Sequence, residues 1–395
     1  MNTALDGLRV LDMTQYEAGT SSTQMLAWLG ADVVKIESPR GDPGRRAFAL
    51  GEADSQYFLN YNSNKRSVVL DLKSEKGRQL LLDLVPKFDA FVENFGPGVI
   101  EQLNIGYDVM SAINPGIIYA RIKGYGLSGP YAEWKCFDPL SQAMAGAFSI
   151  TGEADGPPVK PGPTMADSGT GMQTALAITA AWAQKLRTGE GQFIEVSMQE
   201  VMTMFMRTTG VTQWGREPVQ RKGHRGGAPT GMYACAPGGP NDYVYMLISD
   251  TRMWDRLCVT IGRDDLLVDE RFTTGRLRIA HADELDAEIA AWTSKHTKFE
   301  AMRILCEGGV AAGAILDSME VLNDPHLRAR GFIEEVEHPT EGTITLMKSP
   351  LRMSKSAVAL KAAPLLGADT DEVLAAELGL DAEVLADLRA SGTIA

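Results

Sequence analysis

The sequence lacks the cysteine and histidine spacings that mark disulfide frameworks and most metal sites. Its four cysteines lie far apart, no Cys-x-x-Cys pair is present, and none of the five histidines stands in a His-Glu-x-x-His pattern. These features are typical of free thiols in a reducing compartment and argue against a zinc centre. We therefore expect a cytoplasmic protein without a bound metal.

Long apolar runs and an excess of positive charge are also missing. The most apolar helical segment, residues 175–186, is too short and too polar to cross a bilayer, and the first residues show no signal-peptide pattern. The 38 basic and 51 acidic residues give a formal net charge of −13. Nucleic acid and anionic membrane surfaces repel such a chain, so we expect small-molecule substrates and neither of those partners.

The 395 residues and 44% hydrophobic content predict a globular protein of two domains. Short apolar runs alternate with helix-length segments through the first half of the chain. Strands are predicted at residues 8–14, 31–37, 67–72, 90–94, 117–123 and 191–198. This alternation favours an α/β class with a mostly parallel, Rossmann-like sheet, whose ligands gather at the carboxyl ends of the strands.

The second half of the chain does not show this regular alternation of strands and helices. A long Gly-, Pro- and Arg-rich stretch at 215–231 predicts a loop, a strand is predicted at 242–248, and amphipathic helices follow. The predicted organisation is a large Rossmann-like domain at 1–200 completed by 331–395, a linker at 201–224 and a small α+β domain at 225–325. The last part, 326–395, is predicted to be a return segment with a C-terminal helix.

One carboxylate, Asp167, stands among small residues just before an apolar helical pattern. An aspartate there is usually an N-cap, but Thr170 and Gln173 have the spacing of a capping box and offer another cap. With Thr170 as the cap, Asp167 would lie ionised near the positive end of the helix, ready to act as a nucleophile. Gly169 and Gly171 would then give a ligand close access to backbone N–H donors.

Three further stretches can each be interpreted in two ways. The cations Lys65, Arg66 and Lys73 flank one predicted strand, and Arg40, Arg45 and Arg46 follow another. Each cluster is either a solvated charged surface or a phosphate-binding site. The Gly-rich stretch at 223–231 matches no nucleotide motif and is either a linker or a mobile lid.

Taken in order, several segments resemble the family III CoA-transferases of the CaiB/BaiF type, closest to their formyl-CoA transferase branch. The segments are LDGLRVLDMT, TQMLAWLGADVVKIE, NSNKRSVVLDLK, FVENFGPGVI, IKGYGLSGPY, MADSGTGM, TGEGQFIEVSM, NDPHLRARGF and APLLGADTDEVL. Together they cover nearly the whole chain. The resemblance implies a CoA-transferase that takes a CoA thioester as substrate, needs no permanently bound cofactor, and forms an interlocked-ring homodimer.

The resemblance also implies roles for single residues. Asp167 matches the family's nucleophile, and Gly226 and Gly227 match a flexible active-site loop. The CoA-binding positions that it implies are Glu17, Ala18, Arg40, Leu70, Asp71, Leu72, Lys73, Asn94, Phe95, Lys135 and Phe137. The acyl group would pass from the thioester to Asp167 as a mixed anhydride, and free CoA would then form an aspartyl thioester.

The chain departs from the formyl-CoA transferase pattern at three places near the acyl group or the phosphates. One is the Gly-rich loop, where HRGGAPTG replaces a longer four-glycine loop that ends in glutamine. Glu17 replaces a glutamine, and Ser38 replaces an arginine for which Arg40 is a substitute. Glu17 would repel the second carboxylate of a small diacid, which favours a monocarboxylate or a longer acid. Two alternatives remain: a non-catalytic CoA-binding protein, and an α-methylacyl-CoA racemase on the same scaffold, in which Phe137 would replace an acid–base histidine.

Overall fold

A computed structural model describes residues 3–49, 51, 53–210 and 216–395. These residues form two compact units. Unit 1 comprises Met1–Ala147, Lys160–Glu217 and Arg328–Ala395, and unit 2 comprises Phe148–Val159 and Pro218–Leu327. Within the described residues, no helix is both long enough and apolar enough to cross a membrane.

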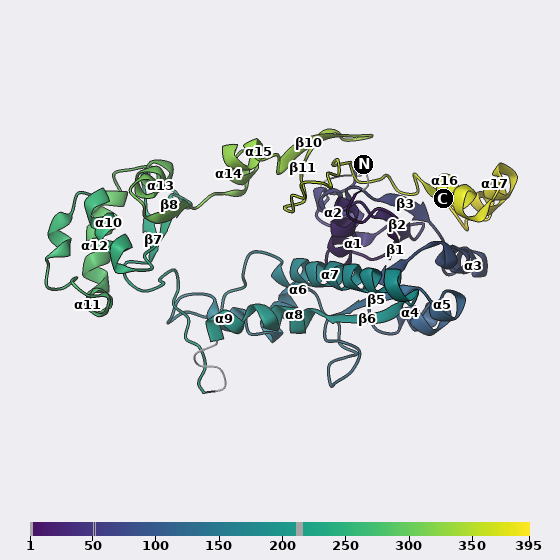
Figure 1. The fold of residues 1–395 in the computed structure, drawn as a ribbon, viewed down its shortest axis with the longest axis horizontal. Coiled ribbons are helices and arrows are strands. Elements are labelled where there is room, and N and C mark those ends of the chain that lie inside the picture. The colour runs from purple at the N-terminus through teal and green to yellow at the C-terminus, as the bar shows by residue number, and fades with distance from the viewer. Residues whose placement is uncertain (1–2, 50, 52, 211–215) are drawn as a thin grey trace. The chain divides into compact units, whose positions relative to one another are not determined.

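Unit 1 is built on a six-stranded sheet in the order β3-β2-β1-β4-β5-β6, and every neighbouring pair of strands is parallel (Figure 1). The strands are β1 (Arg9–Met13), β2 (Asp32–Glu37), β3 (Arg66–Val69), β4 (Ala90–Glu93), β5 (Ile118–Lys123) and β6 (Gln192–Ser197). This result confirms the predicted α/β class. The order reverses between β1 and β4, so the crevice beyond their carboxyl ends is where ligands of such sheets bind.

Both faces of the sheet are covered, which explains why its strands read as nearly continuous apolar runs. Alternate residues of one strand enter different cores: Val10 packs with α1, α7 and α8, whereas Leu11 packs with α3, α16 and α17. The first set of helices is α1 (Ala18–Trp28), α7 (Met165–Thr188) and α8 (Met198–Phe205), and the second is α3 (Glu75–Leu84), α16 (Thr370–Leu378) and α17 (Ala382–Ala390).

Shorter elements complete unit 1. They are α2 (Gln56–Asn62), α4 (Val99–Leu103), α5 (Tyr107–Ile113), α6 (Asp138–Met144), α9 (Arg207–Gly210), and the antiparallel hairpin of β10 (Ile333–His338) and β11 (Gly342–Met347). Helix α15 (Pro325–Ala329) runs across the boundary between the units. Helices α8 and α9 occupy the first part of the stretch predicted as a linker, and residues 211–215 of that stretch lie outside the described residues. The domain boundaries drawn from the sequence stay a prediction.

Unit 2 combines a small antiparallel sheet with helices. The sheet has the order β7-β8-β9, with β7 (Gly231–Ala234), β8 (Tyr243–Leu247) and β9 (Ala311–Ala314). The helices are α10 (Thr251–Thr260), α11 (Gly275–Ala280), α12 (Ala282–Thr293), α13 (Lys298–Glu307) and α14 (Ser318–Leu322). Apolar residues of α10, α12 and α13 share one core with the sheet, in which Trp254, Leu257 and Leu305 are buried.

Helix α7 starts earlier than the predicted cap at Thr170 would allow. It ends at Thr188, followed by Gly189 in the left-handed conformation (φ 77°), which is a common way for a helix to end. Its first residue is Met165, with Thr164 at the N-cap position. Thr170 therefore lies inside the helix, fully buried, and the prediction that it caps the helix is wrong.

Candidate active site

The loops that follow β1 and β4 are fastened to each other at the point where the strand order reverses. The Asn94 side chain accepts a hydrogen bond from the backbone N–H of Gln15 and donates one to its carbonyl oxygen, both at 2.8 Å. Tyr16, the next residue, has a left-handed backbone (φ 58°), which is costly for a bulky side chain. A strained residue held in place at this crevice is typical of a functional site.

Two cavities open at this edge of the sheet, and both are formed within unit 1. The first, which we call the Asp167 cleft, has a volume of about 290 Å³. Its lining comprises Gln15, Tyr16, Glu17, Ala18, Asn94, Phe95, Gly96, Pro97, Ile122, Lys123, Gly124, Ala132, Trp134, Lys135, Cys136, Phe137, Asp167 and Met198. These residues come from the loops after β1, β4 and β5 and from the starts of α1, α7 and α8.

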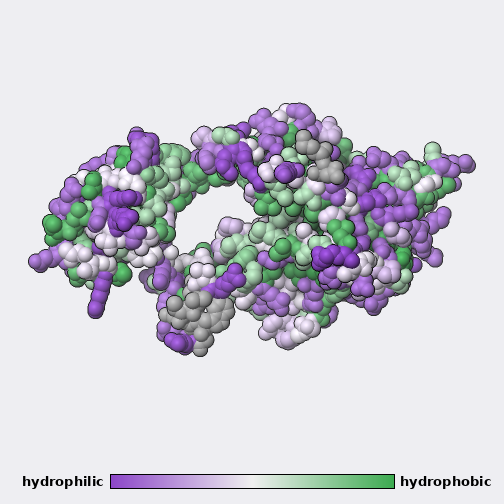
Figure 2. Space-filling view, in the orientation of Figure 1, coloured by the Kyte–Doolittle hydropathy of each residue, from purple (hydrophilic) through white to green (hydrophobic). Residues whose placement is uncertain are grey.

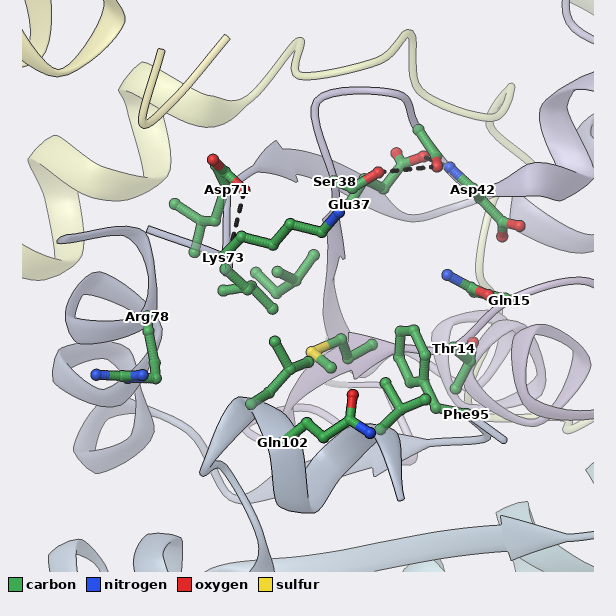
Figure 3. A pocket seen from close by; sticks show the side chains of 17 residues that line it. Thr14, Gln15, Glu37, Ser38, Asp42, Asp71, Lys73, Arg78, Phe95 and Gln102 are labelled. Atoms are coloured by element: carbon green, nitrogen blue, oxygen red, sulfur yellow. Dashed lines mark hydrogen bonds between the residues drawn. The ribbon is translucent and has the colours of Figure 1, made fainter. Parts of the chain in front are cut away.

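The second cavity, which we call the Lys73 pocket, has a volume of about 480 Å³ and shares Gln15 and Phe95 with the first. Its lining comprises Met13, Thr14, Gln15, Ile36, Glu37, Ser38, Gly41, Asp42, Leu70, Asp71, Leu72, Lys73, Arg78, Phe95, Val99, Gln102 and Leu103. In Figure 3 the exposed Lys73 side chain extends across the pocket towards Ser38, whereas the Arg78 guanidinium points away from its centre. The two cavities adjoin each other at these shared residues.

Asp167 lies in the first turn of α7, and a different aspartate caps this turn. The buried carboxylate of Asp138, at the start of α6, accepts hydrogen bonds from the backbone N–H groups of Ala166 (2.9 Å) and Asp167 (3.2 Å). Its other oxygen accepts a bond from Nε2 of Gln142 at 2.7 Å. Because Asp138 satisfies the N–H groups that a helix start leaves free, the Asp167 side chain is not needed as a cap.

Glu17 is the second carboxyl group of the cleft, and it is 1% exposed. Its Oε1 atom accepts hydrogen bonds from the hydroxyls of Thr164 (2.6 Å) and Ser168 (2.8 Å), and it also interacts with the Tyr61 hydroxyl. Burial raises the pKa of Glu17, and the hydroxyl donors oppose that rise. The group joins the loop after β1 to the first turn of α7.

The environment of Asp167 changes its acidity. Burial, followed by the negative charges of Glu17 and Asp138, raises the pKa of Asp167 to about 8. The prediction of an aspartate with an ordinary pKa is therefore wrong, since desolvation and two neighbouring carboxyls outweigh the helix N-terminus. A carboxylate with a raised pKa is the more basic and reactive nucleophile once ionised.

The glycines beside Asp167 serve packing and not ligand access. A Cβ atom on Gly171 would lie 2.0 Å from Oγ of Ser21 on α1, and one on Gly169 would lie 2.5 Å from the Phe205 ring. Both glycines are buried inside α7, where backbone N–H groups bond along the helix. The predicted oxyanion donors at these positions are wrong, because the glycines let α7 pack closely on its neighbours.

Several cations of the predicted phosphate clusters are structural. Lys65 is buried, pairs with Asp12 at 2.9 Å, and burial lowers its pKa to about 8. Arg45 is buried and pairs with Glu37 at 2.7 Å. Arg40 is exposed and is not among the residues that line either cavity. Of the cations singled out in the two clusters, only Lys73 lines one of these two cavities.

The other predicted site residues fall into two groups. Glu17, Ala18, Asn94, Phe95, Lys135, Phe137 and Asp167 line the Asp167 cleft, and Leu70, Asp71, Leu72 and Lys73 line the adjoining pocket. Gly226 and Gly227 lie in unit 2, where Gly227 has φ 108° and the carbonyl oxygen of Gly227 accepts a bond from Thr230. The sequence did not predict that Asp138 holds the start of α7, or that Thr164 and Ser168 bind the Glu17 carboxylate. The local signal for Asp138 was that it stands before a proline at the start of a helix.

These features define a class of α/β protein with two adjoining cavities at the switch point of a parallel sheet and an acidic group in one of them. Comparisons with known proteins identify the family.

The model of CoA-transferase family III matches residues 5–370. A formyl-CoA:oxalate CoA-transferase of Streptomyces coelicolor is 41% identical over 409 residues, covering 99% of each chain, and one of Rhodopseudomonas palustris is 38% identical over 418 residues, covering 100% of this chain and 98% of the other.

Solved structures agree with this assignment. A CaiB/BaiF family protein from Brucella suis superposes with a TM-score of 0.86 at 32% identity, covering 95% of this chain and all of the other. The protein Rv3272 from M. tuberculosis gives a TM-score of 0.80 at 29% identity over 93% of this chain and 98% of the other. The chain belongs to CoA-transferase family III, and it is a CoA-transferase.

Proposed function

We propose that the protein moves CoA from an acyl-CoA to a free carboxylic acid through covalent intermediates on Asp167. The observation that carries this proposal is the position of Asp167: its partly buried carboxyl lines a cleft and is not used as a cap, because Asp138 holds the start of α7. The raised pKa of Asp167 gives its ionised form the nucleophilicity that attack on a thioester requires.

The proposed cycle balances without a cofactor. An Asp167 oxygen attacks the thioester carbonyl, the C–S bond breaks, and CoA leaves as the thiolate, which gives a mixed anhydride. The thiolate then attacks the Asp167 carbonyl carbon and releases the donor acid, which carries away one Asp167 oxygen. The acceptor carboxylate attacks this aspartyl thioester, and the released thiolate takes the acceptor acyl group and restores the Asp167 carboxylate.

The adjoining cavities support a placement for CoA. The Lys73 pocket holds the adenosine-diphosphate end, where the exposed ammonium of Lys73 pairs with phosphate. The pantetheine arm passes Gln15 and Phe95, which line both cavities, and brings the thioester into the Asp167 cleft. Lys135, exposed at the cleft, and Gly226 and Gly227 of the predicted active-site loop remain contacts to be tested.

The test is to trap the intermediate. The protein is incubated with formyl-CoA, quenched with hydroxylamine and digested, and the peptide that contains Asp167 is examined by mass spectrometry for a hydroxamate. In parallel, an ¹⁸O-labelled acceptor acid should leave one label on Asp167 after turnover. A hydroxamate on Asp138 or Glu17, with none on Asp167, would move the nucleophile to another residue.

The relatives' names suggest formyl-CoA as donor and oxalate as acceptor for a first assay. The racemase alternative predicts that an α-methylacyl-CoA exchanges its α-proton for deuterium without any acceptor acid. Phe137 cannot move a proton, and it makes an edge-on contact with the Tyr16 ring at 6.3 Å between centroids. We therefore expect CoA transfer to acids and no α-deuterium exchange.

The homodimer stays part of this proposal. Large apolar side chains are exposed on neighbouring helices of unit 1: Leu140 and Met144 on α6, Met172 and Leu176 on α7, and Phe205 on α8. Figure 2 shows hydrophobic residues over the part of unit 1 where Figure 1 draws α6 and α7. A second copy of the chain would cover such a surface. A dimer that persists on dilution in sedimentation experiments is expected, and a freely exchanging monomer would contradict it.

A further inference from the structure

The Asp167 cleft is acidic in a way that restricts the second substrate. Glu17 and Asp138 both lie close enough to Asp167 to raise its pKa by their charge. Glu17 cannot easily turn away, because its carboxylate is buried and accepts bonds from the Thr164 and Ser168 hydroxyls. Burial raises the pKa of Glu17, whereas the two hydroxyl donors on one of its oxygens favour the ionised form. When Glu17 is ionised, an acid that approaches Asp167 meets a negative charge held in a fixed position.

The cations of the cleft do little to offset this charge. Lys123 is 5% exposed, forms an ion pair with Glu93 at 3.3 Å and donates to the carbonyl oxygen of Phe95. Lys135 is exposed and lies on a loop between β5 and α6. Among the lining residues that the structure describes, no buried cation is thus left over to bind a second carboxylate beside Asp167.

The rest of the lining is largely apolar. The rings of Tyr16 and Phe137 contact each other edge-on, and Trp134 and Phe137 are 55% and 57% exposed. Ile122 and Met198 lie among the lining residues and are buried. A surface of this kind accepts an uncharged carbon chain and offers few partners for a second charge.

We propose that the acid accepting CoA carries a single carboxylate on an uncharged body, and that Glu17 disfavours small dicarboxylates such as oxalate. The inference rests on the proposed function, since it concerns the acid that attacks the Asp167 thioester. In a short diacid the attacking carboxylate holds the other one within a few ångströms of the site. Repulsion by Glu17 at such a distance lowers kcat/KM about tenfold or more.

The test uses the full chain with formyl-CoA as donor and three pairs of acids of equal carbon number: acetate and oxalate, propionate and malonate, butyrate and succinate. The CoA thioesters formed are quantified by mass spectrometry, and the Asp167 hydroxamate is measured in the same samples. For wild type we expect kcat/KM to favour the monocarboxylate at least about tenfold in the shortest pair and less in the longest.

Glu17→Gln should reduce this preference about tenfold, chiefly through a lower KM for the dicarboxylate. The control is Glu190→Gln, which removes the same charge from an exposed position between α7 and β6 and should leave the preference unchanged. The inference is overturned if wild type uses oxalate as well as acetate, or if Glu17→Gln leaves the ratio unaltered. It is also overturned if no acid is accepted while the Asp167 adduct forms. Absence of that adduct instead contradicts the proposed function.

Discussion

The two adjoining cavities differ in how their charged groups are held. In the Asp167 cleft, Glu17 is fixed by two hydroxyls, and the Asp138 carboxylate behind the first turn of α7 is fixed by three N–H donors. In the Lys73 pocket, the cation is an exposed side chain that reaches across open space (Figure 3). Catalytic groups need a fixed position, whereas a flexible side chain with a positive charge is sufficient to bind a phosphate. Under the proposed function, the Asp167 cleft carries out the chemistry and the Lys73 pocket binds CoA, so mutations in the two cavities should have different consequences.

The largest effect is expected from a substitution of Asp167, the proposed nucleophile. Asp167→Asn should lower transfer by at least about 10⁴-fold, because the amide cannot form the anhydride. Binding of CoA, measured by calorimetry, should stay within a few-fold of wild type, since the Lys73 pocket is unchanged. Full activity in a folded variant would assign the covalent step to another group.

The second effect is on the pH profile, and it follows from the raised pKa of Asp167. In the proposed cycle the ionised form attacks, so kcat/KM should rise with pH, with a midpoint near pH 8 and a plateau above about pH 9, and at pH 6 it should be about 100-fold below that plateau. Glu17→Gln removes a charge that raises this pKa and should move the midpoint to lower pH. An unchanged midpoint in that variant would show that the two groups do not interact.

The stability of the folded protein should fall with rising pH over the range in which kcat/KM rises. The folded pKa of Asp167 lies above its unfolded value of about 3.9, so the folded state binds the extra proton between about pH 4 and pH 8. Stability is therefore lost as pH rises through this window. The melting temperature of Asp167→Asn should therefore increase relative to that of wild type between pH 5 and pH 8. If the melting temperatures of the two proteins change equally with pH, the raised pKa of Asp167 is contradicted.

A smaller effect is expected where Asp138 holds the start of α7. Asp138→Ala removes the acceptor of two backbone N–H groups and should lower kcat about tenfold or more, through misplacement of Asp167. Asp138→Asn keeps an acceptor oxygen and removes the charge, so it should retain more activity and shift the pH midpoint downwards. If both variants behave alike in kcat and pH profile, positioning by Asp138 is excluded.

On the other side of the comparison, Lys73→Ala should raise KM for the CoA donor about tenfold and leave kcat nearly unchanged, because a charge-assisted contact to phosphate contributes about 1.5–3 kcal/mol. The matched control is Lys76→Ala, which removes an equally exposed cation from α3, outside the pocket lining. A KM that does not change in Lys73→Ala would place the phosphates elsewhere.

The sequence predicted what depends on local pattern and missed what depends on distant partners. The strands of the parallel sheet were predicted because both faces are covered and their apolar runs are continuous. Lys65 and Lys73 lie in one short segment, yet Lys65 pairs with Asp12, 53 residues away, and Lys73 is exposed. The cap of α7 was mispredicted for the same reason, since Asp138 reaches Asp167 across 29 residues.

The last prediction concerns the support of the Asp167 cleft and separates packing from chemistry. Gly171→Ala places a methyl group 2.0 Å from Oγ of Ser21 and 3.1 Å from the carbonyl oxygen of Ala18, where α7 meets α1. Such overpacking typically costs about 1–3 kcal/mol of unfolding free energy. Gly162→Ala is the control, because its added methyl meets nothing within 4 Å. If Gly171 served as an oxyanion donor, an alanine would keep the N–H group and leave the stability unchanged. A lower melting temperature of Gly171→Ala, with CoA binding preserved, would instead show that Gly171 is needed for close packing of α7 on α1.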